Sequence, residues 1–355
     1  MLVYVGGYTE SPAGNADGIS VYRFDPESGA LTLALTVRDV VNPSFLALSR
    51  DQRFLYAVNE RADGGVSSFA RNPETGDLSP LNQQPSQGAD PCYISLDSSG
   101  RYALVANYSS GVIASLPIAA DGRLGPATSV IQHEGSSVVA GRQDGPHAHM
   151  IAPTPDGRYV LATDLGTDQV MIYQLDLDTG TLQPNPDGPA SVRAEPGAGP
   201  RHFAFAPTVR TLYVIDELSS TLSVYAYDDD GGTLNPIQSV STLPDDFRGE
   251  STCAQVVVSP DGRFVYGSNR GHDSVAIFAV EGVGGEVRLV GHEPTLGKSP
   301  RNIALDPGGA WLLAANQRSD TIVVFQRDLE SGLLTATGQP TPSPTPAVMV
   351  FADSQ

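Results

Sequence analysis

The sequence predicts an all-β protein, a seven-bladed β-propeller with four antiparallel strands in each blade. Three observations lead to this fold. A pair of short apolar runs joined by a tight turn recurs six times in the 355 residues, two more strand-like runs follow each pair, and the two chain ends supply the halves of a seventh unit. We expect a single domain over residues 1–355.

Each repeat begins with two apolar runs, which we name strands A and B, that meet in a turn of the D-x-G-R kind. Strand B ends at Asn or Asp, and these end residues recur at intervals of 48, 57, 52, 53 and 47 residues. They are Asn59, Asn107, Asp164, Asp216, Asn269 and Asn316. For Asn59, Asn107 and Asn269 we expect hydrogen bonds to turns, which short amides commonly make. For Glu60 and Asp164 we expect ion pairs with arginines.

Two further strands follow strand B in each repeat. Alternating runs such as TLSVYAY from Thr221 and TIVVFQR from Thr321 are typical of half-buried strands. A glycine turn, as at Gly232 or Gly332, then leads into a more polar run. No helical period longer than one turn stands out, so the repeat holds four strands.

The seventh repeat is divided between the chain ends. PAVMVF from Pro346 has the pattern of strand A, and LVYVGGYT from Leu2 has that of strand B. Pairing the two in one blade would close the ring without exposed sheet edges. Two β-sandwiches, the competing architecture, would not produce seven repeats in phase.

Composition and charge exclude several classes of function. The chain has 21 basic and 40 acidic residues, a formal net charge of −19, and 40% hydrophobic residues. Such a field repels nucleic acids and anionic membranes, so we expect neither as a partner. The N-terminus lacks the basic start and apolar run of a secretion signal, and Cys92 and Cys253 cannot make a disulfide framework. We therefore expect a cytoplasmic protein, and a monomer, since closed propellers are commonly monomeric.

The repeats also act as an alignment that isolates residues not needed by the blade. Because strands A and B are antiparallel, the start of A and the end of B lie at one edge of the blade. We expect both sets of positions at one mouth of a central channel. The strand A starts are Ser44, Cys92, His149, Arg201, Ala254 and Arg301. The residues after strand B are Tyr8, Glu60, Tyr108, Leu165, Glu217, Arg270 and Gln317.

The predicted mouth concentrates cations and histidines. Four of the six histidines fall at or beside these positions, namely His147, His149, His202 and His272. Three arginines join them in an otherwise acidic chain: Arg201, Arg270 and Arg301. This local charge predicts a binding site for a small anion. His133 and His292 fall outside these positions, and we expect changes there to be silent.

Other chemistries have weaker support. His147 and His149 form an H-x-H pair of the kind zinc sites use, with Glu217 as a conceivable third ligand, but we expect no metal. The sequence has no G-x-S-x-G, P-loop or dinucleotide motif, and Cys92 lacks a Cys-His sequence pattern. No haem, quinone or flavin motif is visible, so we expect no cofactor. A non-catalytic scaffold would spread exposed apolar residues over a face, whereas the departures from the repeat concentrate at the mouth.

Several motifs resemble the β-propeller lactonase family. They are YVGGYT at Tyr4, NPSFLA at Asn42, LYAVNE at Leu55, PHAHM at Pro146, GPRH at Gly199, SPDGRFVYGSNRGHDS at Ser259 and ANQRSD at Ala315. The resemblance covers essentially the whole chain. It implies a hydrolase acting on a small anionic lactone, most simply 6-phosphogluconolactone in the pentose phosphate pathway. The alternative it implies is a lactonizing cycloisomerase acting on carboxymuconate-type diacids, the activity of a fungal relative.

The resemblance places the active site at the same mouth and implies ester hydrolysis. That reaction needs a base for water, donors for the oxyanion and an acid for the leaving ring oxygen. His147 or His149 would be base and acid, and Glu217 would orient a histidine or be the base itself. Arg270 would face the developing charge. The predicted substrate-binding residues are Arg201, His202, His272, Arg301 and Gln317.

Overall fold

Antiparallel sheets account for nearly all the regular structure of the computed structural model, which describes residues 1–12, 14–207 and 210–353. Within these ranges the strands form seven sheets, six of four strands and one of five. The helical structure of the described residues is one short 3₁₀ turn, η1 (Gln317–Ser319), which is too short to cross a membrane. The prediction of an all-β, seven-bladed β-propeller is confirmed.

The chain forms two compact units. The first unit comprises Met1–Thr36, Arg201–Tyr227 and Leu234–Phe351, and the second comprises Val37–Pro200, Asp228–Thr233 and Ala352–Gln355. Of the sheets in the described residues, four belong mainly to the first unit and three to the second.

Each sheet of the first unit contains four strands. In order across the sheet, one consists of β29 (Pro346–Ala352), β1 (Leu2–Gly7), β2 (Ile19–Phe24) and β3 (Leu31–Val37). The next consists of β17 (Pro200–Phe205), β18 (Thr211–Asp216), β19 (Thr221–Asp228) and β20 (Thr233–Ser241). A third consists of β21 (Thr252–Val258), β22 (Phe264–Arg270), β23 (Ser274–Glu281) and β24 (Glu286–Pro294). The last consists of β25 (Pro300–Leu305), β26 (Trp311–Asn316), β27 (Thr321–Arg327) and β28 (Leu334–Pro342).

The sheets of the second unit follow the same plan with one addition. The first is β4 (Leu46–Leu48), β5 (Phe54–Asn59), β6 (Gly65–Arg71) and β7 (Leu78–Pro85). The second is β8 (Pro91–Leu96), β9 (Tyr102–Asn107), β10 (Val112–Pro117) and β11 (Ser129–Gln132). The third is β12 (Ala148–Pro153), β13 (Val160–Asp164), β14 (Gln169–Leu175) and β15 (Leu182–Pro184), with β16 (Ser191–Arg193) also paired to β14. This fifth strand was not predicted.

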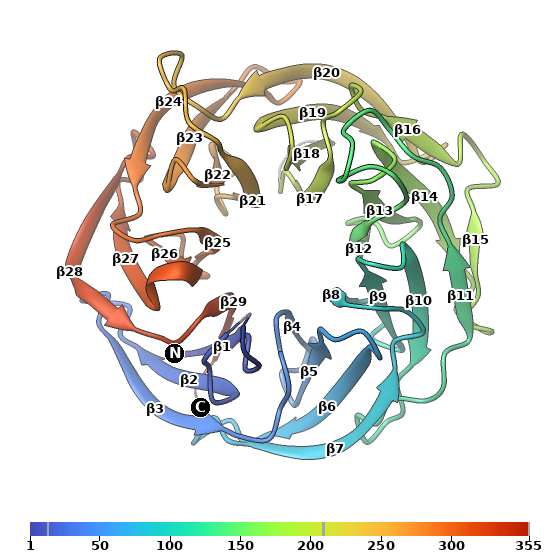
Figure 1. Ribbon diagram of the computed structural model, residues 1–355, viewed down its shortest axis with the longest axis horizontal. Coiled ribbons are helices and arrows are strands. Elements are labelled where there is room, and N and C mark those ends of the chain that lie inside the picture. Colours follow the sequence, from blue (N-terminus) through green and yellow to red (C-terminus); the bar gives the residue numbers. More distant parts are fainter. Residues whose placement is uncertain (13, 208–209, 354–355) are drawn as a thin grey trace. The chain divides into compact units, whose positions relative to one another are not determined.

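The two chain ends share one sheet, as predicted. Figure 1 shows the red C-terminal strand β29 beside the blue N-terminal strand β1, and the sheet order is β29-β1-β2-β3. Met349 of β29 lies in one buried cluster with Val3 and Val5 of β1. That cluster also contains Trp311 and Leu313 of the neighbouring sheet, so β29 contributes to the packing between two blades.

The ends of strand B are fixed by asparagine side chains. Nδ2 of Asn59 donates to the carbonyl of Val41 at 2.8 Å, and Nδ2 of Asn107 donates to that of Ser86 at 3.0 Å. Nδ2 of Asn269 makes the same kind of bond, to the carbonyl of Thr242 at 2.8 Å. The predicted structural role of these asparagines is confirmed, and each one ties strand B to the segment that leads into its own sheet.

Candidate active site

The first unit holds two arginines on one carboxylate. Arg201 lies on β17 and Glu217 directly follows β18, while Arg270 ends β22 in the next sheet. Oε2 of Glu217 is 2.9 Å from Nε of Arg201 and 2.7 Å from Nη2 of Arg270. Arg201 and Glu217 are only 2% and 6% exposed. The register argument from the repeats therefore brought together three residues that are far apart in the sequence.

This cluster has spare capacity for an anion. Two cations face one carboxylate, so the group carries a net positive charge in a mostly dehydrated setting. Nη1 of Arg201 also donates to the carbonyl of Ala254, and Nη2 of Arg270 donates to that of Cys253 at 2.8 Å. Nε of Arg270 is buried and makes no hydrogen bond with a described residue. A buried donor left unused is costly unless a ligand or water takes it.

His202 lies beside this cluster as a neutral base. Its Nδ1 is 2.5 Å from Oε1 of Gln255, and since an amide oxygen only accepts, Nδ1 carries the proton. Burial, with the charge of Arg201, holds the pKa of His202 well below its ordinary value. His202 thus contributes a polar ring, not a charge, to any substrate binding.

The second unit holds His147 in a defined orientation. Nδ1 of His147 is 3.0 Å from the carbonyl oxygen of Tyr108, and the two rings stack with centroids 4.5 Å apart. Because a carbonyl only accepts, Nδ1 is the protonated nitrogen and Nε2 keeps its lone pair. Nε2 makes no hydrogen bond with another residue of the described ranges. His147 is partly exposed, so a water molecule can reach its ring.

His149 is in a different environment. It is 4% exposed and lies where the register of β12 against β13 shifts, between Ala148 and Met150. From their spacing of two residues we expected both histidines to lie on one regular strand and to point to the same side. Instead His147 precedes β12, and the bulge turns the ring of His149 edge-on to Tyr108 at 5.4 Å. Similar shifts occur at Cys92 in β8 and at Arg301 in β25.

The bulge also brings a thiol to His149. Sγ of Cys92 lies 3.7 Å from Nδ1 of His149 and 3.3 Å from its carbonyl oxygen. Cys92 is 5% exposed. The sequence showed no Cys-His pattern because these residues are 57 positions apart. Since a buried thiol is poorly placed to attack a substrate, packing is the simplest role for this contact.

The carboxylate of Asp164 holds the backbone of His147 in place through a hydrogen bond. One carboxylate oxygen, Oδ1, accepts the backbone N–H of His147 at 2.9 Å and that of Thr167 at 3.0 Å. The other, Oδ2, is 2.7 Å from Nδ1 of His133. The expectation that Asp164 pairs with an arginine is therefore wrong, because a buried histidine takes that place. Glu60, the other acidic residue of that expectation, accepts a hydrogen bond from the hydroxyl of Ser44.

The remaining predicted binding residues have contacts of their own. The guanidinium of Arg301 lies over the ring of Tyr8, 5.3 Å from its centroid. Nδ1 of His272 is 2.6 Å from the hydroxyl of Ser274, and its ring meets that of His292. Gln317 begins the 3₁₀ turn η1. Their roles in binding stay predictions.

The whole chain is similar to known lactonases. The profile of a family described as "Lactonase, 7-bladed beta-propeller" matches residues 2–351. The chain belongs to this family. A 6-phosphogluconolactonase of Bacillus subtilis (strain 168) is 37% identical over 350 residues, which cover 98% of this chain and 97% of that protein. A 6-phosphogluconolactonase of Formosa agariphila is 35% identical, with 94% of each chain covered.

A solved structure of a lactonase is also similar to the whole chain. A periplasmic gluconolactonase of Pseudomonas aeruginosa superposes with a TM-score of 0.94 at 36% identity, and 100% of both chains is covered. At this level of likeness the fold and its strand order are shared. The substrate is not fixed by the likeness, because these lactonases carry names that refer to different sugar lactones.

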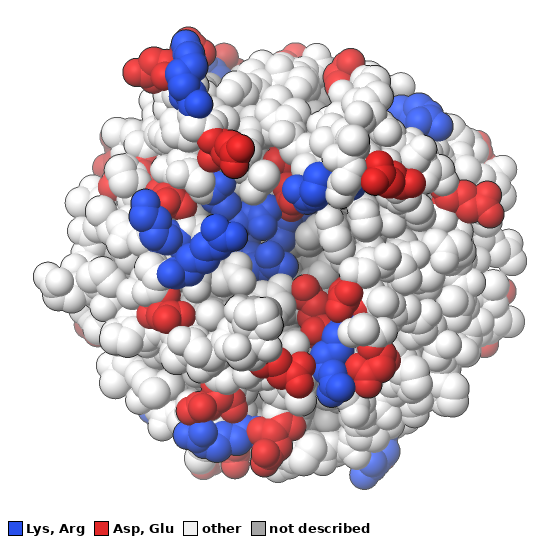
Figure 2. All heavy atoms as spheres, in the orientation of Figure 1, with Lys and Arg blue, Asp and Glu red and all other residues white. Residues whose placement is uncertain are grey.

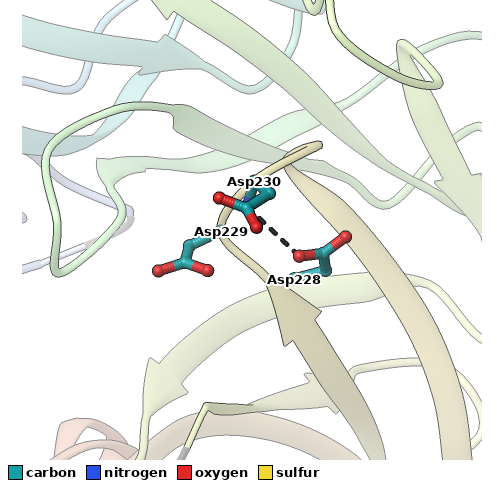
Figure 3. Close-up of side chains that lie close together, drawn as sticks. All are labelled: Asp228, Asp229 and Asp230. Atoms are coloured by element: carbon teal, nitrogen blue, oxygen red, sulfur yellow. Dashed lines mark hydrogen bonds between the residues drawn. The ribbon is translucent and has the colours of Figure 1, made fainter.

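One acidic group contains none of the predicted site residues. Among the described residues, one group of three potential ligands lies close enough together to hold a metal ion. It consists of Asp228, Asp229 and Asp230. Figure 3 shows them on the turn between β19 and β20, with the carboxylate of Asp229 directed away from the other two. The backbone N–H of Asp230 bonds Oδ1 of Asp228 at 3.1 Å, as in an ordinary turn. An exposed acidic turn of this kind is no indication of a metal centre.

Sequence reasoning missed several residues that support the site. None of them stands at a predicted mouth position. Gln255 contacts His202. His133 contacts Asp164, and Tyr173 contacts His133. One signal was available for His133. It directly follows the fourth strand of its sheet, as Ser86 and Thr242 do in other sheets, and in each case the backbone N–H donates to the carbonyl just before the third strand.

Proposed function

We propose that this protein hydrolyses the ring ester of a small anionic sugar lactone, with 6-phosphogluconolactone as its substrate. The observation that carries the proposal is the hydrogen bond from Nδ1 of His147 to the carbonyl of Tyr108. It fixes the tautomer in which Nε2 has a free lone pair and can take a proton from water. The same nitrogen, once protonated, can return the proton to the ring oxygen that leaves.

The arginine cluster supplies the complementary chemistry. When water attacks the lactone carbonyl, negative charge develops on its oxygen, and preorganised donors stabilise that charge more than they stabilise the substrate. Arg270 has donors that its protein contacts leave unused, and Arg201 is held rigidly beside it through Glu217. Glu217 is a poor base, because two guanidinium groups compete with a proton for the same oxygen.

The relatives support both the reaction and the substrate. Two of them are named 6-phosphogluconolactonase, and a third is named a gluconolactonase. Hydrolysis of the phosphorylated lactone is a step of the pentose phosphate pathway. We place the protein in the cytoplasm, since phosphorylated sugars do not cross membranes unaided.

The test is a hydrolysis assay that subtracts the spontaneous rate. Three substrates are compared: 6-phosphogluconolactone, unphosphorylated gluconolactone and carboxymuconolactone. The proposal expects the highest kcat/KM on the phosphorylated lactone, with activity unchanged after exhaustive chelation. Turnover of carboxymuconolactone alone would support the cycloisomerase alternative. No rate above the spontaneous one on any lactone would overturn the proposal, and loss of activity restored by zinc or calcium would overturn the metal-free mechanism.

A further inference from the structure

A small cavity opens beside Arg270, among the loops that lead into β21 and β25. It has a volume of about 290 Å³ and lies wholly in the first unit. Three cations line it: Arg270, Lys298 and Arg318. Figure 2 shows Lys and Arg side chains (blue) gathered over β21, β22 and β25, and the cavity is lined by the ends of β21 and β22 and by the loop before β25. Lys298 is the only lysine of the chain.

The cations have donors to spare. Arg318 makes no side-chain hydrogen bond or ion pair with a described residue, and Nε of Arg270 is buried without a partner. Nζ of Lys298 is 3.1 Å from Oδ2 of Asp273, which leaves two of its three N–H donors. Protein contacts therefore use only some of the donors of Lys298 and Arg270, and none of the side-chain donors of Arg318 within the described residues.

The acidic residues that line the cavity do not take up the unused donors of the cations. Asp273 is occupied within the loop, because Oδ1 accepts the backbone N–H groups of Ser299 at 2.8 Å and Gly271 at 3.2 Å. Its Oδ2 faces Lys298. Glu250 also lines the cavity, so the three cations exceed the two carboxylates. Local charge at the cavity therefore favours an anion.

The backbone holds the cavity in shape. The N–H of Arg318 donates to the carbonyl of Lys298 at 3.0 Å, and the N–H of Lys298 donates to the hydroxyl of Ser319 at 2.9 Å. Gly271 has a φ of +113°, and a Cβ there would overlap the carbonyl of Glu250. The loop after Arg270 thus approaches the segment before β21 in a way that only glycine permits.

We propose that this cavity binds the phosphate ester of the substrate, and that Lys298 and Arg318 give the enzyme its preference for phosphorylated lactones. A phosphate monoester has three terminal oxygens and a charge between about −1.5 and −2 near pH 7, so it can occupy several donors at once. A carboxylate offers two oxygens and one charge. The cavity is at the small end of ligand sites, which suits one substituent of a sugar lactone. The inference rests on the proposed function for its substrate.

The experiment compares the wild type with the double variant Lys298→Ala/Arg318→Ala. Arg288→Ala is the matched control, because Arg288 is an exposed cation of the same unit that lies outside the cavity and pairs with Glu281. The measured quantity is the ratio of kcat/KM for 6-phosphogluconolactone to that for gluconolactone. We expect the double variant to lower this ratio at least tenfold, mainly through KM, and the control to change it less than twofold. A ratio within twofold of the wild type in the double variant would overturn the inference.

Inorganic phosphate provides a readout that does not depend on turnover. Its binding is measured by calorimetry on the wild type and both variants at low ionic strength. Binding that is lost in the double variant and retained in Arg288→Ala supports the subsite even if no lactone is hydrolysed, in which case only the proposed function fails. Equal binding to all three proteins, or none to the wild type, overturns the subsite.

Discussion

Nδ1 of His133 lies 2.7 Å from Oδ2 of Asp164, and both side chains are buried. Nε2 of His133 is 3.1 Å from the hydroxyl of Tyr173. Burial and the charge of Asp164 raise the pKa of Tyr173, so its hydroxyl remains a donor. Through the other oxygen of Asp164 this chain of hydrogen bonds reaches the backbone of His147. His133 is therefore unsuitable as the silent control that its sequence position suggested.

We predict that His133→Ala destabilises the protein by about 2 kcal/mol, since it removes a donor from a buried carboxylate. His292→Ala should cost less, because His292 is only partly buried and makes one hydrogen bond, to the carbonyl of Thr242. Urea unfolding of the two variants measures the difference. Equal losses would contradict the special role of His133.

Asp164 should affect the reaction through His147. Asp164→Ala removes the acceptor of the His147 N–H, so we expect kcat for lactone hydrolysis to fall at least tenfold. Asp164→Asn keeps an oxygen for that N–H and should retain more activity. The pH–rate profile separates this role from a purely structural one. A change in stability with an unaltered kcat in the folded fraction would show that Asp164 does not position His147.

The two histidines of the PHAH motif should differ. His147→Ala is expected to lower kcat a hundredfold or more with little change in KM, and to remove the limb of the pH profile that reports the general base. His149→Ala should act mainly on stability, because His149 is buried against Tyr108 and Cys92. The opposite pattern would make His149 the base. Loss of the limb only in Glu217→Gln would make the carboxylate the base.

The arginine cluster predicts effects on both stability and rate. Glu217→Gln leaves two guanidinium groups without their shared anion, and breaking a buried ion pair costs about 3–5 kcal/mol. Arg201→Ala and Arg270→Ala should each lower kcat/KM a hundredfold, which corresponds to about 2.7 kcal/mol of transition-state stabilisation. Lysine at either position should restore only part of it, because the fork of donors is lost. Full activity in the lysine variants would argue against directed hydrogen bonds.

The sequence predicted the fold because the information is local and repeated. Apolar alternation and glycine turns recur in every blade, and the antiparallel register then placed Arg201, Glu217 and Arg270 together. The register shifts at Cys92, His149 and Arg301 were not predicted, because a period of two assumes regular strands. The pairing of His133 with Asp164 was missed because the repeats were compared at the first two strands, whereas His133 follows the fourth, where other sheets have Ser86 or Thr242.

His202 predicts a dependence of stability on pH. Its pKa is near 6.5 in the unfolded chain and is held well below that value in the folded protein, chiefly by burial. Below pH 6.5 the unfolded state therefore binds a proton that the folded state does not, and this contribution to stability is lost as the pH falls. In His202→Gln, which can still donate to Gln255, we expect a smaller loss of stability between about pH 7.5 and 5. Parallel losses in the two proteins would contradict the assignment.

The sheet shared by the two chain ends should depend on β29 for its stability. Deletion from Pro346 onward removes β29, exposes the edge of β1, and takes Val348 and Met349 from the core, where they are 1% and 5% exposed. Two such side chains stabilise a protein by roughly 3–6 kcal/mol, so the melting temperature should fall by many degrees. If the truncated chain does not fold, Met349→Ala tests the same contact, with an expected cost of about 2–5 kcal/mol. Leu33→Ala is the control, because Leu33 is 54% exposed on β3 of the same sheet and its loss should change stability by less than about 0.5 kcal/mol. A truncated protein that melts within a degree or two of the full-length one would show that β29 does not hold this sheet together.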